Sequence, residues 1–63
     1  MKYYYIEDSG GPTPMYTWMN LDEILGFIEK VSKKKNQSRN EKFWGRALKK
    51  HIPHWKILDT MEE

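Results

Sequence analysis

The sequence predicts a small α+β domain in which a three-stranded antiparallel sheet carries two helices on one face, in the order ββααβ. Three observations lead to this prediction. Two aromatic segments alternate with a period of two on either side of a loop rich in Gly and Pro, two later segments carry apolar residues at helical spacing, and a final segment alternates again. With 63 residues, we expect one domain that comprises residues 1–63.

The first two segments predict a β-hairpin. Residues 2–7 and 15–19 are rich in aromatic strand formers, and residues 8–14 between them contain two glycines and two prolines. Two alternating segments joined by such a loop pair antiparallel.

Three consecutive tyrosines in the first strand cannot all be buried. Alternation places Tyr3 and Tyr5 on one face, and Tyr4 with Ile6 on the other. We expect the face that carries Tyr3 and Tyr5 to be exposed and available to bind a partner.

The first helix has strong local signals at its start. Asn20 and Glu23 have the spacing of a capping box, and Met19 and Ile24 that of a hydrophobic staple. We expect this helix to stop near Lys35. Its predicted apolar stripe consists of Leu21, Ile24, Leu25, Phe27, Ile28 and Val31.

The second helix follows a short connection at Asn36 and Gln37. Ser38 and Glu41 offer another capping box, and Pro53 ends the helix because it lacks an amide hydrogen. Helical periodicity assigns to the core Phe43, Trp44, Ala47, Leu48, His51 and Ile52.

The last segment predicts a third strand that returns to the hairpin. Its alternation places Trp55, Ile57 and Asp59 on one face and Lys56, Leu58 and Thr60 on the other. We expect Trp44 and Trp55 to fill the core, although aromatic side chains also serve as stacking platforms for bases.

Positive charge is concentrated in the middle of the chain. Residues 30–51 carry nine Lys or Arg and one Glu, whereas residues 1–29 carry one Lys and five Asp or Glu. Cations grouped on a rigid element are typical of phosphate recognition, although a solvated helix face has the same composition. The predicted nucleic-acid contacts are Lys33, Lys34, Lys35, Arg39, Lys42, Arg46, Lys49 and Lys50.

Two functions remain open. The first is binding of DNA or RNA, in a regulatory role, through the basic helix; a homodimer would add contact area. The second is binding of an acidic protein surface, as an inhibitor or adaptor of the kind that phages and mobile elements encode against host enzymes. Residues 43–57, about a quarter of the chain, locally resemble the recognition helix and following strand of winged-helix domains in phage and plasmid replication proteins.

No pattern indicates catalysis or a cofactor. There is no cysteine, and His51 and His54 share neither a helical nor a strand face, so we expect no metal site. The glycines do not form a phosphate-binding loop, and no carboxylate lies in an apolar segment that would tune it for acid–base chemistry. The sequence has no apolar run for a membrane span and no signal-peptide pattern, so we expect a cytoplasmic, non-enzymatic protein.

Overall fold

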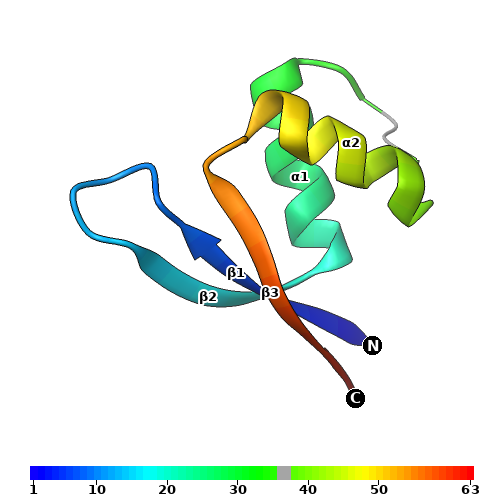
Figure 1. Cartoon of the computed structure of the whole chain (residues 1–63). Helices are drawn as coiled ribbons and strands as arrows, with labels where there is room; N and C mark the ends of the chain where they lie inside the picture. Colours follow the sequence, from blue (N-terminus) through cyan, green and yellow to red (C-terminus); the bar gives the residue numbers. More distant parts are fainter. Residues whose placement is uncertain (36–37) are drawn as a thin grey trace.

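The structure, a computed structural model, describes residues 1–35 and 38–63. The elements follow in the order β1 (Lys2–Asp8), β2 (Met15–Asn20), α1 (Leu21–Ser32), α2 (Glu41–His51) and β3 (Trp55–Glu62). Both helices lie on one side of a three-stranded antiparallel sheet (Figure 1). The predicted α+β class and ββααβ order are therefore confirmed. The predicted connection at Asn36 and Gln37 lies outside the described residues.

Strand β1 is the centre of the sheet, whose strand order is β2-β1-β3. β1 pairs antiparallel with both neighbours, which confirms the predicted hairpin and the returning third strand. Tyr4 and Ile6 are buried beneath the helices, whereas Tyr3 and Tyr5 lie on the opposite face of the sheet. The alternation predicted for β1 is thus correct.

The alternation predicted for β3 holds up to Leu58 and is wrong for Asp59 and Thr60, which lie on the opposite faces from those predicted. Tyr5 lies opposite Asp59, but Ile6 lies opposite Ile57, so Leu58 has no partner in β1. Such a β-bulge shifts the pattern by one residue. Asp59 consequently lies on the same face as Tyr5, not on the face of Ile57, as uninterrupted alternation had predicted.

Helix α1 begins as predicted. The Glu23 amide donates to the Asn20 side chain at 2.9 Å, and the Glu23 carboxylate accepts from the Asn20 amide at 3.2 Å. The helix ends at Ser32, slightly before the predicted Lys35, because Lys33 adopts a left-handed conformation with φ of 61°.

Helix α2 begins later than the sequence predicted. Asn40 is the N-cap, and its side chain accepts from the Lys42 amide at 3.0 Å. Ser38 instead accepts from the Asn40 amide at 3.1 Å and lies before the helix. The helix therefore runs from Glu41 to His51, and the predicted capping box at Ser38 is wrong.

The core lies between the helices and the inner face of the sheet. Trp44, only 1 % exposed, meets the Tyr4 ring edge-on with 5.2 Å between ring centroids. Trp55 packs at the margin of the core, as predicted, whereas Phe27 and Val31 of the predicted apolar stripe remain exposed. The buried residues are Tyr4, Ile6, Ile24, Leu25, Ile28, Trp44, Leu48 and Ile52. Across the described ranges, no helix has the length and apolar character needed to cross a membrane.

Candidate functional site

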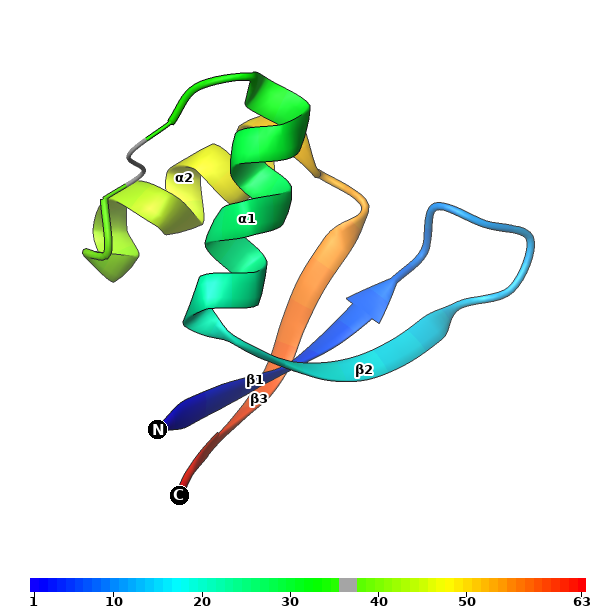
Figure 2. The same cartoon turned by 180° about the vertical axis from the view of Figure 1, so that it is seen from behind.

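Four cations lie together on the outer face of α2. Trp44 and Leu48 turn inward from this helix and are buried. At about 100° per residue, the four cations fall roughly opposite these two side chains, and all four are exposed. Because Trp44 and Leu48 belong to the core, the cations point away from it; Figure 2 shows α2 behind α1. We call this set the basic stripe: Lys42, Arg46, Lys49 and Lys50.

The basic stripe is not neutralised by carboxylates. In residues 1–35 and 38–63, the ion pairs join Arg39 to Asp22 and His54 to Asp8, and neither pair involves α2. Glu41, the acidic residue of α2, lies in the first turn of the helix. Four neighbouring cations without acidic partners create a positive potential that attracts an anionic ligand.

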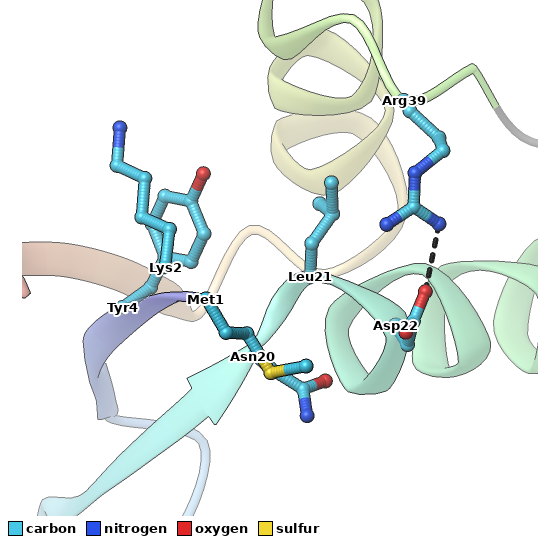
Figure 3. A pocket seen from close by; sticks show the side chains of 7 residues that line it. All are labelled: Met1, Lys2, Tyr4, Asn20, Leu21, Asp22 and Arg39. Carbon is cyan, nitrogen blue, oxygen red and sulfur yellow. Dashed lines mark hydrogen bonds and ion pairs between the residues drawn. The ribbon is translucent and has the colours of Figure 1, made fainter. Parts of the chain in front are cut away.

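Arg39 is separated from the basic stripe. It lies before the Asn40 cap, and its guanidinium donates to the Asp22 carboxylate in the first turn of α1 at 2.7 Å, as Figure 3 shows. Both side chains are exposed, so the ion pair contributes about 0–1 kcal/mol. The predicted helical position of Arg39 is thus wrong, and its charge is already shared with a carboxylate.

Lys33, Lys34 and Lys35 lie in the segment that follows α1. Lys33 forms the C-cap of that helix, and the Lys34 amide donates to the Ser32 hydroxyl at 3.2 Å. All three side chains are exposed. The predicted nucleic-acid contacts therefore occupy three places: the α2 helix, the Arg39 ion pair and the segment after α1.

Phe43 lies beside the basic stripe and not in the core. It is 54 % exposed, although the periodicity had assigned it to the apolar face. Phe43 lies three residues before Arg46 and seven residues before Lys50, and this spacing places it on the same side of α2 as these cations. An exposed aromatic ring among cations supplies a stacking surface beside charged groups.

A second exposed surface occupies the outer face of the sheet. Tyr5 stacks on Tyr16 with 5.9 Å between ring centroids and contacts Trp18 at 4.9 Å. Tyr3, partly exposed, follows Tyr5 on the same face of β1. The predicted partner-binding residues Tyr3 and Tyr5 therefore belong to a larger set, the aromatic face: Tyr3, Tyr5, Tyr16 and Trp18.

The aromatic face is not positively charged. The Tyr16 hydroxyl donates to the Glu7 carboxylate at 3.1 Å, and this hydrogen bond with the nearby negative charge raises the pKa of Tyr16. Asp59 also lies on this face, opposite Tyr5. These carboxylates oppose a phosphate backbone, so the aromatic face suits a protein surface better than a nucleic acid.

The sequence interpretation had not included Tyr16 and Trp18 in the site. Tyr16 and Trp18 are two residues apart and therefore lie on one side of the second strand, but the sequence could not show which side. The pairing of Tyr5 with Trp18 and of Glu7 with Tyr16 decides this, because directly opposed residues share a face.

The surface also has a shallow hollow of about 320 Å³. Its polar groups already have structural roles: Asp22 pairs with Arg39, Asn20 caps α1, and the Lys2 amine lies 5.4 Å from the Tyr4 ring centroid. Within the described ranges, no three His, Cys, Asp or Glu side chains are grouped as metal ligands would be. Figure 3 shows the lining residues: Met1, Lys2, Tyr4, Asn20, Leu21, Asp22 and Arg39.

Comparison of the chain with models of protein families, with curated proteins and with solved structures finds no match.

Proposed function

We propose that this protein binds nucleic acid through the basic stripe of α2, as a small non-enzymatic regulator. One observation carries the proposal: Lys42, Arg46, Lys49 and Lys50 share an exposed helix face on which no carboxylate neutralises them among the described residues. Phosphate groups are the anions that such a row of cations fits, because each phosphate that a cation neutralises releases condensed counterions, which adds favourable free energy.

The neighbouring side chains support this interpretation. Phe43 adds an exposed aromatic ring that stacks on a base or packs against a sugar. The helix is anchored by Trp44 and Leu48, so the cations are presented from a rigid element and lose little conformational freedom on binding. A nucleic-acid ligand also accords with the cytoplasmic location that we expect.

The test is fluorescence anisotropy with labelled duplex and single-stranded DNA and RNA of about 20 nucleotides. We expect saturable binding that the double substitution Lys42→Glu, Arg46→Glu lowers by at least about 30-fold, since two phosphate contacts are lost and two repulsions are added. The matched control is Lys30→Glu, Lys56→Glu, which reverses two exposed lysines outside the basic stripe with the same change in net charge.

We expect the control variant to lose less than about fivefold in affinity. Equal losses in both variants would mean that net charge alone drives binding, and would contradict a specific role of the basic stripe. No binding at about 50 mM salt would contradict the proposal altogether.

The aromatic face favours a second candidate, a protein-binding inhibitor or adaptor. The exposed rings of Tyr16 and Trp18 pack on the half-buried Tyr5, and aromatic residues are enriched where proteins bind one another. An acidic host protein would instead contact the basic stripe, on the other side of the molecule. Affinity capture from a host lysate, compared between the wild type and Tyr5→Ser, Trp18→Ser, tests this candidate; equal capture by both would contradict it.

A further inference from the structure

The two edges of the sheet differ in their protection against further pairing. β3 carries Lys56, Asp59 and Glu62 and is interrupted by the bulge at Leu58. Charged side chains and bulges are the usual features that keep an edge strand from pairing with another chain. β2 has the sequence MYTWMN, without a charged residue or a proline, and its register with β1 is regular. The β2 edge is therefore unprotected.

The β2 edge is open along residues 15–18, whereas Met19 packs against the core. Met15 is 66 % exposed, Tyr16 50 % and Trp18 41 %, and Thr17 is exposed as well. Figure 2 shows the end of the β1–β2 hairpin extending beyond the two helices. In the described part of the chain, the backbone of residues 15–19 takes part in no hydrogen bond other than those of the sheet. An added strand would therefore meet open backbone groups and open side chains.

We propose that β2 pairs antiparallel with β2 of a second copy of this chain, which joins two sheets into one of six strands. In a continuous sheet, opposed residues must share a face, so the two-fold axis is perpendicular to the sheet and passes midway between one residue and its copy in the partner. With Thr17 beside the axis, Thr17 opposes the partner's Thr17, and Tyr16 opposes the partner's Trp18. Thr–Thr and aromatic pairs are favourable across antiparallel strands.

Charge favours a second copy over a charged partner. β2 contributes no charge, and the Glu7 and Asp8 carboxylates opposite it belong to β1, where Glu7 accepts a hydrogen bond from the Tyr16 hydroxyl. Two such edges therefore meet without opposing like charges. The other edge, β3, carries three charged side chains and lacks this self-complementarity.

The available area sets the strength of the dimer. Aromatic side chains bury about 150–250 Å² each when fully covered, and roughly half of that remains exposed at Tyr16 and Trp18. With Met15 and the strand backbone, the surface area that the two copies can bury together is on the order of 800 Å². This is below the roughly 1,200 Å² that stable interfaces bury. We therefore expect a weak, reversible dimer whose population rises with protein concentration.

Pairing of this kind has a consequence for the basic stripe. An axis perpendicular to the sheet keeps both helical layers on the same side, so the dimer presents two basic stripes to one ligand. This consequence rests on the proposed function, but the pairing itself does not. Dimer formation without nucleic acid tests the pairing, and nucleic-acid binding by a monomeric variant tests the proposed function. Either proposal can therefore fail without the other.

The first experiment is disulfide trapping, because the chain contains no cysteine. Opposed residues of antiparallel strands have Cα atoms about 4.5–5.5 Å apart, within the range that a disulfide spans. Under oxidising conditions near 200 µM, we expect Thr17→Cys to form linked dimers at least about tenfold faster than Thr60→Cys. The latter places the same thiol on the exposed β3 edge. Equal rates for the two variants would overturn the proposal.

The second experiment is sedimentation velocity from about 10 µM to 1 mM without nucleic acid. We expect the average mass of the wild type to rise with concentration, and Thr17→Lys to remain monomeric because it opposes two lysines across the axis. Thr60→Lys is the control and should dimerise like the wild type. A wild type that stays monomeric throughout, or a Thr17→Lys variant that dimerises equally well, would overturn the proposal.

Discussion

The two broad faces of this molecule have opposite characters. The helical face presents the basic stripe of α2, four exposed cations without acidic partners among the described residues. The outer face of the sheet presents the aromatic face, with Tyr5 packed against Tyr16 and Trp18, and carries the carboxylates of Glu7 and Asp59. Positive charge is concentrated on one side, and the cluster of aromatic side chains lies on the other.

This difference follows from the two-layer fold. Two helices cover only one face of the sheet, so alternate residues of β1 have unlike surroundings: Tyr4 and Ile6 are buried, whereas Tyr3 and Tyr5 are not. The aromatic residues of the outer face are therefore not needed to fill the core of one copy. Each face can be altered without the other, and substitutions separate the two binding hypotheses.

The substitution with the largest expected effect unfolds the domain and so removes both faces at once. Trp44→Ala removes a side chain that is 1 % exposed and packs on Tyr4, so we expect a loss of about 3–5 kcal/mol in the free energy of unfolding. A domain of this size has about that much stability in total, so the variant should be largely unfolded. Thermal denaturation followed by circular dichroism measures this.

The matched variant is Trp18→Ala on the aromatic face. Trp18 is 41 % exposed and contacts Tyr5, so we expect a loss of about 0.5–1.5 kcal/mol and a folded protein. Similar destabilisation by both substitutions would contradict the assignment of Trp44 to the core and Trp18 to a binding surface.

Two substitutions with smaller expected effects test which cations belong to the nucleic-acid contact. Arg46 lies within the stripe, whereas Arg39 is paired with Asp22 at 2.7 Å. We expect Arg46→Ala to lower nucleic-acid affinity about 5- to 10-fold and Arg39→Ala about twofold, because a cation already paired with a carboxylate gains less from a phosphate. Anisotropy titrations of both variants make the comparison; a larger loss for Arg39→Ala would move the contact surface to the start of α1.

The sequence was informative wherever a local rule determined the structure. Alternation separated Tyr4 from Tyr3 and Tyr5, and the spacing of Asn20 and Glu23 identified the capping box of α1. Both features depend on residues within one element. The ββααβ order followed from the same kind of local information.

The remaining features depend on competition or on distant contacts. Ser38 and Asn40 are both good capping residues, and the chain uses Asn40, which leaves Arg39 outside α2. The bulge at Leu58 depends on how β3 pairs with β1. Phe43 lies at the margin of the apolar face of its helix, where only the position of the neighbouring elements decides its exposure.

The most direct test of the basic stripe is the salt dependence of nucleic-acid affinity. Binding of duplex DNA is measured by anisotropy from about 50 to 200 mM salt for the wild type and for Lys42→Glu, Arg46→Glu. If four cations contact phosphates, the logarithm of the association constant should fall with the logarithm of the salt concentration with a slope of about −3 to −4. We expect the double variant to have a slope of about −2 or shallower; a wild-type slope near zero, or the same slope in both proteins, would contradict nucleic-acid binding through α2.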